Sequence, residues 1–280
     1  VPKVFEDWIF YDSPLFMYIC IDNIEVLVYY VSITLVQLLD IDREGNSLDT
    51  ILKAENVTKK YLNKTALDSM NLSVEKGKVM GLLGPNGSGK TTFLKIAAGL
   101  LTKNSGTVEI NGVPVGRETK AFVSYLPDKQ FLYKWMKIKD AFDYYQDFFN
   151  DFNRDKAVKL LKFMNLDESM KVSALSKGMT EKLLLSLCLS RNSKLYLLDE
   201  PLGGVDPVTR EKILDAILDN YSENSSIIIT THLVSDIERL FDSVSFIQEG
   251  KIVLEGNAEE LRNERSMSID EIYREVFKDA

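Results

Sequence analysis

Cysteine and histidine are scarce in this sequence of 280 residues, which holds two cysteines and one histidine. Cys20 and Cys188 lie far apart, and no C-x-x-C pair or Cys/His cluster occurs. These absences exclude a disulfide scaffold and a zinc site of the common spacings. The low use of cysteine favours a reducing compartment.

Positive charge is also in deficit. The chain has 34 Lys and Arg against 42 Asp and Glu, a net charge of −8, and no run is rich in Lys or Arg. Because an acidic surface repels a phosphate backbone, we do not expect nucleic acid as a partner.

Long hydrophobic runs are missing as well. The longest uncharged apolar run, 26–39, lies between Glu25 and Asp40 and is shorter than the roughly 20 residues of a membrane-spanning helix. Residues 1–47 contain no alanine and many aromatics, and they lack the basic start and the cleavage site of a signal peptide. A membrane anchor and a genuine extra strand or helix remain possible interpretations of this segment. We favour a third, that it is translated upstream sequence and that Leu48 begins the natural protein.

From Leu48 onward the sequence has the character of an α/β domain, and its clearest signal is a phosphate-binding loop. The apolar run 78–83 predicts a buried parallel strand, and helix-compatible sequence follows at 92–98. Between them lies a full match to G-x-x-x-x-G-K-[ST], in the order of strand, loop and helix that the motif requires. We expect Lys90 to contact the β- and γ-phosphates and the Thr91 hydroxyl to bind Mg²⁺. The expected nucleotide-binding residues of this loop are Gly84, Pro85, Asn86, Gly87, Ser88, Gly89, Lys90, Thr91 and Thr92.

A second apolar strand, 194–199, ends in two adjacent carboxylates. Asp199 is placed to hold Mg²⁺ through water, and Glu200 is the candidate base that orients and deprotonates an attacking water. The competing interpretation is a strand end that is acidic only because it is exposed. The loop upstream favours the metal and base roles.

The tetrad Leu175-Ser176-Lys177-Gly178, placed before a helix that leads into this second strand, resembles the signature of ATP-binding cassette (ABC) ATPases. The resemblance covers about residues 51–256. It implies that Ser176 and Gly178 close over the γ-phosphate of ATP bound to the opposite subunit. Two nucleotide domains, identical or different, would then sandwich two ATP molecules.

Three further positions agree with this family in their order. The resemblance implies that Tyr61 stacks on adenine, that His232 contacts the γ-phosphate and holds the catalytic geometry, and that Asp206 links the two sites across the dimer. A core tyrosine is the alternative for Tyr61. Asp206 is also a plausible helix N-cap before Pro207.

The sequence departs from the family pattern in three places. Asp128 stands where the family has a glutamine that contacts Mg²⁺, and we keep it as a candidate metal residue. Met179-Thr180 replace Gly-Gln after the signature, and Gly203-Gly204 replace a Ser-Ala type of loop.

The resemblance implies an α/β fold of the P-loop NTPase, ABC-ATPase type. Its parts are a RecA-like parallel-sheet core, an antiparallel β subdomain and an α-helical subdomain. The expected divisions are an atypical extension at 1–47, the ATPase domain at 48–256 with its helical subdomain at about 129–178, and a short helical tail at 257–280.

Helical spacing predicts two helices of that subdomain at 141–149 and 157–164. Tyr133, Trp135 and Met136 are either part of its core or a groove for a helix of a membrane partner. In the tail, Ser268 and Glu271 form a possible capping box.

The resulting expectation is an ATP-hydrolysing subunit at the cytoplasmic face of the membrane. It would use ATP and Mg²⁺ to power a separate transmembrane permease. The signature and loop sequences and the short tail resemble small bacterial exporter ATPases of antibiotic or cell-envelope response. The alternatives are a soluble, non-transport cassette ATPase and a nucleotide-binding regulator of low turnover.

Overall fold

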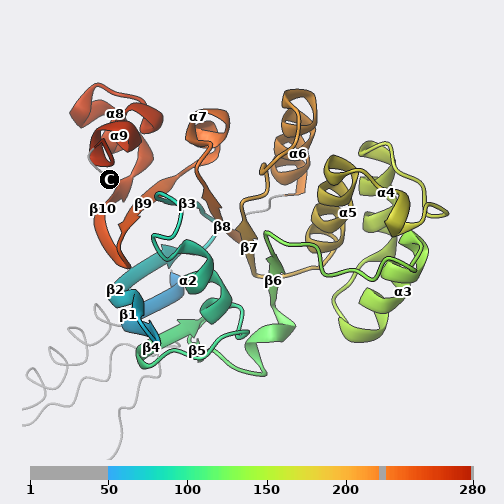
Figure 1. Cartoon of the computed structure of the whole chain (residues 1–280), viewed down its shortest axis with the longest axis horizontal. Helices are drawn as coiled ribbons and strands as arrows, with labels where there is room; N and C mark the ends of the chain where they lie inside the picture. Colours follow the sequence, from blue (N-terminus) through green and yellow to red (C-terminus); the bar gives the residue numbers. More distant parts are fainter. Residues whose placement is uncertain (1–49, 221–224, 279–280) are drawn as a thin grey trace, which may run out of the picture. The chain divides into compact units, whose positions relative to one another are not determined.

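The computed structural model describes residues 50–220 and 225–278 (Figure 1). By its contacts the chain divides into a unit Val1–Leu48 and a unit Asp49–Ala280, and the second carries everything described below. The three interpretations of residues 1–47 lie outside the described residues.

A six-stranded sheet forms the centre of this unit, in the order β10-β9-β3-β8-β7-β6. The strands β9, β3, β8, β7 and β6 are parallel, and β10 pairs antiparallel with β9. Every residue of β3, β7 and β8 is buried, which explains why these strands are nearly continuous apolar runs rather than alternating ones. The strands are β3 (Val79–Leu83), β6 (Val123–Leu126), β7 (Leu195–Asp199), β8 (Ser226–Thr231), β9 (Ser243–Gln248) and β10 (Lys251–Asn257).

The register of the central strands brings the sequence motifs to one edge. Leu83, which precedes the phosphate loop, pairs with Thr231, and Asp199 pairs with Thr230. The carboxyl ends of β3, β7 and β8 therefore carry the loop, the two carboxylates and the histidine side by side. Ligands of α/β sheets bind at such strand ends.

A four-stranded antiparallel sheet, β2-β1-β4-β5, forms the expected β subdomain. One apolar cluster joins it to α2 (Lys90–Ala97) and to a face of the central sheet, with Phe93 and Leu94 of α2 fully buried. The predicted α/β cassette fold is confirmed. The strands are β1 (Thr50–Tyr61), β2 (Lys64–Glu75), β4 (Ser105–Ile110) and β5 (Val113–Pro114).

The helices α3 (Ile138–Phe148), α4 (Arg154–Phe163) and α5 (Lys177–Leu189) gather on one side of the unit (Figure 1). The first two begin three residues before their predicted starts. Met136 is buried in the core, whereas Tyr133 and Trp135 are exposed and stack on each other with ring centroids 6.0 Å apart. Of the three groove candidates, Met136 is therefore a core residue.

The remaining helices are α6 (Pro207–Asn220), α7 (Val234–Ile237), α8 (Ala258–Arg265) and α9 (Ile269–Val276), with short 3-10 turns η1 (Thr119–Ala121), η2 (Val172–Ala174) and η3 (Glu238–Leu240). The predicted capping box of α9 is present, with Ser268 and Glu271 satisfying each other's backbone N–H groups. Within the described ranges, every helix falls short of the length and apolarity that crossing a membrane requires.

Candidate functional site

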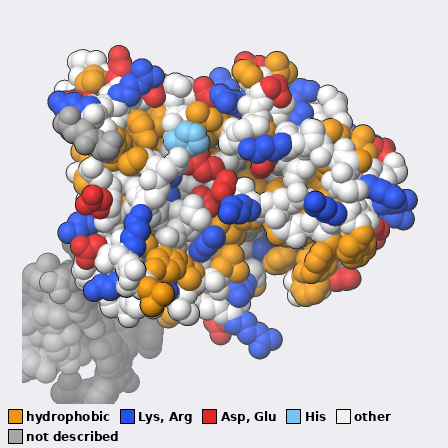
Figure 2. All heavy atoms as spheres, in the orientation of Figure 1, with side chains coloured by type: hydrophobic (Ala, Val, Ile, Leu, Met, Phe, Trp, Pro, Cys, Tyr) orange, Lys and Arg blue, Asp and Glu red, His pale blue; other side chains and the backbone are white. Residues whose placement is uncertain are grey.

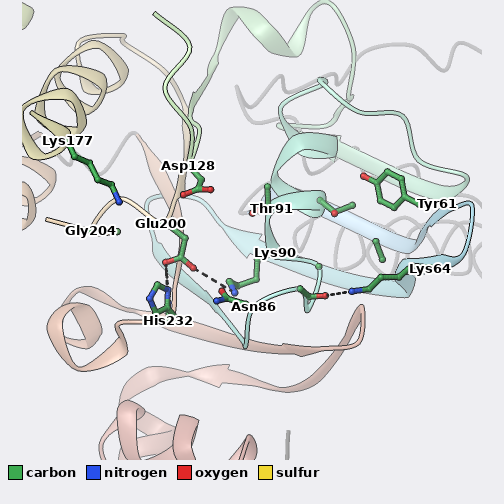
Figure 3. Close-up of a pocket in the computed structure, with 15 residues that line it drawn as sticks. Tyr61, Lys64, Asn86, Lys90, Thr91, Asp128, Lys177, Glu200, Gly204 and His232 are labelled. Atoms are coloured by element: carbon green, nitrogen blue, oxygen red, sulfur yellow. Dashed lines mark hydrogen bonds and ion pairs between the residues drawn. The ribbon is translucent and has the colours of Figure 1, made fainter. Parts of the chain in front are cut away.

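A pocket of about 540 Å³ opens at the carboxyl ends of the central strands (Figure 3). Figure 2 shows the single histidine at the surface beside acidic side chains in this hollow. The predicted site residues that line the pocket are Tyr61, Asn86, Gly87, Gly89, Lys90, Thr91, Thr92, Asp128, Glu200 and His232. Those outside the lining are Gly84, Pro85, Ser88, Ser176, Gly178, Asp199 and Asp206.

The phosphate loop is shaped by a glycine that no other residue could replace. Gly89 has φ +119°, and a Cβ there would lie 2.6 Å from the carbonyl oxygen of Ala66. The next residue, Lys90, is buried, and its amine donates to the carbonyls of Gly84 (2.6 Å) and Pro85 (3.1 Å). Burial lowers the pKa of Lys90, and the nearby Glu200 and Asp199 oppose that change. The loop therefore holds a cation at the start of α2, where a helix N-terminus also favours anions.

Asp199 is a buried carboxylate that three hydroxyl groups hold in place. Its Oδ1 accepts from Thr91 Oγ1 at 3.0 Å and from Thr230 Oγ1 at 2.8 Å, and its Oδ2 accepts from the Tyr125 hydroxyl at 3.3 Å. Burial and the charge of Asp199 together raise the pKa of Tyr125. Thr91 and Asp199, predicted as metal residues from distant parts of the sequence, thus present oxygen atoms to each other.

Glu200 and His232 form a pair at the mouth of the pocket. Glu200 Oε2 lies 2.9 Å from His232 Nδ1 and accepts from the His232 backbone N–H at 3.3 Å, while Oε1 lies 3.8 Å from the Lys90 amine. Glu200 has φ +54°, and its own N–H donates to the Thr230 carbonyl at 3.0 Å. A left-handed conformation is uncommon for glutamate, and such backbone strain concentrates at functional sites.

Ser176 is the N-cap of α5, and its hydroxyl accepts from the Met179 N–H at 3.3 Å. The helix therefore begins at Lys177, two residues before Met179, near which the sequence predicts its start. Ser176 is exposed and lies outside the pocket of its own chain, whereas the Lys177 amine rests against Gly204 within the pocket lining.

Asp206 caps α6 as predicted. Its carboxylate accepts from the Thr209 N–H at 3.0 Å and from the Thr209 hydroxyl at 2.7 Å. These two bonds hold the pKa of Asp206 below its ordinary value. Asp206 is exposed, so its carboxylate fixes the start of the helix while the loop remains at the surface.

Tyr61 lies at the far end of the pocket with 48% of its surface exposed, so it is not a core tyrosine. Beside it, Lys64 donates from its amine to the Gly87 carbonyl at 3.3 Å. Sequence reasoning missed Lys64, and it did not place Lys177 in this pocket. The position of Lys64 just beyond the turn after Tyr61 is the one signal that could have indicated it.

Asp128 follows β6 and is an exposed carboxylate that lines the pocket. Its influence is seen on Glu181 in α5: burial raises the pKa of Glu181 to about 7, Lys177 opposes the shift and Asp128 adds to it. The charge of Asp128 therefore reaches the start of α5.

These residues can together bind a nucleoside triphosphate. The pocket lining offers the loop and the Lys90 amine for phosphates, the Tyr61 ring for a base and the Glu200 carboxylate as a proton acceptor. The family model described as "ABC transporter" matches residues 67–203. "Lantibiotic transport ATP-binding protein SrtF" from Streptococcus pyogenes is 34% identical over 221 residues, which cover 76% of this chain and 96% of that protein.

Solved structures give the same result. "Structure of ATP binding subunit of ABC transporter" matches with a TM-score of 0.73 and 25% identity, over 81% of this chain and 100% of that one. The dimeric post-hydrolysis state of the cassette MJ0796 bound to ADP and Pi matches with a TM-score of 0.67 and 21% identity, over 74% and 98% of the two chains. The second likeness shows the fold alone.

Proposed function

This chain belongs to the ABC transporter family as an ATP-binding subunit that hydrolyses ATP, and from that premise we propose how its residues divide the work. The observation that carries the proposal is the meeting of Lys90, Asp199, Glu200 and His232 at one edge of the central sheet. These residues come from three separate strand ends. Lys90 lies 3.8 Å from Glu200, Glu200 lies 2.9 Å from His232, and Asp199 is held by the Thr230 hydroxyl at 2.8 Å.

Mg²⁺ fits the donor set on the metal side of the pocket. Thr91 and Asp199 offer hard oxygen ligands 3.0 Å apart, and Asp128 lines the same pocket as Thr91. The described residues contain no cluster of three or more His, Cys, Asp or Glu that could hold a metal by themselves. This agrees with the usual Mg²⁺ site, which combines one or two carboxylates with water and substrate phosphates. Bound Mg²⁺ would neutralise charge on the β- and γ-phosphates.

The chain's own residues then have distinct tasks. The loop N–H groups and the Lys90 amine bind the phosphates, and Tyr61 stacks on the base. Glu200 orients a water molecule and accepts its proton as the water oxygen attacks the γ-phosphorus and ADP leaves. His232 holds Glu200 through the 2.9 Å contact and reaches toward the same phosphate.

A second cassette subunit completes the site in this proposal. Ser176 is exposed at the start of α5 and lies outside the pocket of its own chain, so its hydroxyl and the helix N-terminus are accessible to nucleotide on another subunit. The related cassette MJ0796 was solved as a dimer. Gly178 and the Asp206 loop would meet that subunit as well.

The helical subdomain of this chain offers a surface on which a membrane subunit could dock. Tyr133 and Trp135 are exposed, at 61% and 69% of their surfaces. Close by in sequence, Phe131 lines a largely apolar groove whose lining also includes Lys95, Lys120 and Lys129. A cytoplasmic helix of the permease with an apolar face and acidic flanks fits both features. This proposal places the chain at the cytoplasmic face of the membrane, bound through its partner.

Relatives of the chain are ATP-binding subunits of membrane transporters, which gives it a membrane-associated role rather than that of a soluble, non-transport ATPase or a regulator. We propose export as the direction of transport. SrtF is named for lantibiotic transport, and the signature and loop sequences resemble those of small exporter ATPases.

Substitution of the proposed base tests this function. Glu200→Gln keeps the shape of the side chain, so ATP binding should persist while hydrolysis slows by about 10²–10⁴-fold. The variant should accumulate as an ATP-bound dimer, measured by size-exclusion chromatography with and without ATP. Wild-type turnover in Glu200→Gln would remove this residue from the role of base.

Substitution of an exposed aromatic tests the docking surface. Trp135→Ala should reduce co-purification with the membrane subunit, because it removes a large aromatic contact. The fold should remain intact, since Trp135 is exposed. Phe163→Ala is the matched control, since Phe163 is an exposed aromatic on α4. Equal recovery of the membrane subunit with both variants would contradict docking at Trp135.

A further inference from the structure

An ion pair connects the helix that follows the Asp206 loop to the helix that follows His232. Arg210 Nη1 of α6 lies 2.6 Å from Asp236 Oδ2 of α7. About a third or less of each side chain is exposed, so solvent and salt screen this pair less than a surface pair. Its residues are 26 positions apart in sequence.

Arg210 is firmly attached to the Asp206 loop. Its backbone N–H donates to the Asp206 carbonyl at 3.0 Å, and the Asp206 carboxylate caps the same turn through Thr209. Within residues 50–220 and 225–278, Nε of Arg210 is buried without a hydrogen-bond partner. The guanidinium therefore depends on Asp236 for its charge-assisted bond.

Asp236 lies near His232 in the sequence. It lies in α7, which begins two residues after His232, and His232 contacts Glu200 through its ring and its backbone. At the other end of this segment, Glu238 accepts from the Asp270 N–H at 3.0 Å and its carbonyl accepts from Arg262 at 2.6 Å. The segment is thus held by the C-terminal helices on one side and by Arg210 on the other.

We propose that Arg210 and Asp236 are positioning residues, whose ion pair ties the segment carrying His232 to the loop carrying Asp206. When that loop meets the second subunit, the pair keeps the imidazole aligned with Glu200. The inference rests on the proposed roles of Glu200 and His232. Neither Arg210 nor Asp236 lines the nucleotide pocket, so their effect passes through His232.

The kinetics of four variants and one control test the role of this ion pair. Arg210→Met and Asp236→Asn should each lower kcat by about ten- to a hundredfold, as misalignment of a catalytic group does, with the KM for ATP within about twofold of wild type. The double variant should be no worse than either single one, because both remove the same interaction. Arg210→Lys, which keeps the charge, should recover most of the activity. Arg265→Met is the control, since it removes another arginine ion pair, with Glu275 between α8 and α9.

The single histidine provides a readout that does not depend on turnover. In a preparation with a histidine-free affinity tag, the ring protons of His232 give unambiguous NMR signals. Arg210→Met and Asp236→Asn should shift these signals, while Arg265→Met leaves them in place. Unchanged signals in Arg210→Met, additive losses in the double variant, or a loss in Arg210→Lys as large as in Arg210→Met would each overturn the proposal. Absence of ATP hydrolysis by the wild type would instead contradict the proposed function, and the NMR comparison would still decide the role of the ion pair.

Discussion

At the scale of single residues, burial and neighbouring charge control the groups around the pocket. Asp199 accepts hydrogen bonds from three hydroxyl groups, and Lys90 is buried against carbonyls and near two carboxylates. Glu181 differs, because its burial and the nearby Asp128 favour the neutral form against the pull of Lys177. Its charge state should therefore change in the physiological range.

Glu181→Gln should stabilise the protein at alkaline pH. The pKa of Glu181 is raised from 4.5 to about 7 in the folded chain, so the folded state binds a proton that the unfolded state loses between these values. Stability from this group is present below pH 4.5 and is lost as the pH rises through 7. Allowing for partial exposure, the permanently neutral Gln should be about 1 kcal/mol more stable than Glu at pH 8 and no different at pH 4.5.

Urea unfolding at the two pH values measures this difference. Glu264→Gln, on an exposed part of α8, is the control and should show the same difference from wild type at both. A Glu181→Gln variant whose advantage does not grow between pH 4.5 and pH 8 would contradict a raised pKa.

The positions of residues within one motif were predictable because they follow from adjacent sequence. Lys90, Thr91 and the Asp199–Glu200 pair are examples. Lys64 and Thr230 were not, because Lys64 meets the loop from another sheet and Thr230 holds Asp199 across a strand pairing. Such contacts depend on strand order, which periodicity does not contain.

At the scale of elements, caps decide where helices begin. The apolar spacing located α3 and α4 but started both late, since spacing becomes visible only after the first turn. Helix α5 is harder to predict from spacing, because its residues Leu183 to Leu189 are all buried and show no polar face. Its start in the structure is set by the Ser176 cap. The same kind of signal correctly identified the capping box of α9.

Removal of that capping box should weaken the C-terminal helices. Ser268→Ala deprives the Glu271 N–H of its acceptor at the start of α9, so the free energy of unfolding should fall by about 1 kcal/mol. Ser173→Ala, an exposed serine in η2, should change it by less than about 0.5 kcal/mol. Chemical denaturation of both variants measures the comparison, and equal stabilities would show that the cap contributes nothing.

At the scale of the whole molecule, the two halves of the proposed site would lie on different subunits. Lys90 and Glu200 line the pocket of their own chain, whereas Ser176 and Gly178 lie outside it. The alternation of strands and helices predicted the parallel core, but the order that inserts β3 between β8 and β9 came only from the structure. That order places the phosphate loop beside His232 and leaves the signature at the start of α5.

Mixing two inactive variants tests whether the subunits share their sites. Lys90→Ala removes the amine that is proposed to bind the phosphates. Gly178→Asp adds a negative charge to the signature without a steric clash, since a Cβ at this position meets only Val205 at 3.8 Å. Each variant alone should hydrolyse ATP poorly. In a mixture, half of the dimers hold one chain of each kind and one of their two sites is intact, so roughly a quarter of the wild-type rate should return.

The matched control combines Lys90→Ala with Glu200→Gln. Both defects lie on the pocket side of their own chains, so every site in a mixed dimer contains one of them and the mixture should stay inactive. Recovery with Gly178→Asp but not with Glu200→Gln places the signature in the partner's site. If neither mixture recovers activity, two copies of this chain do not complete each other, and the second cassette is then a different protein or the signature acts within its own chain.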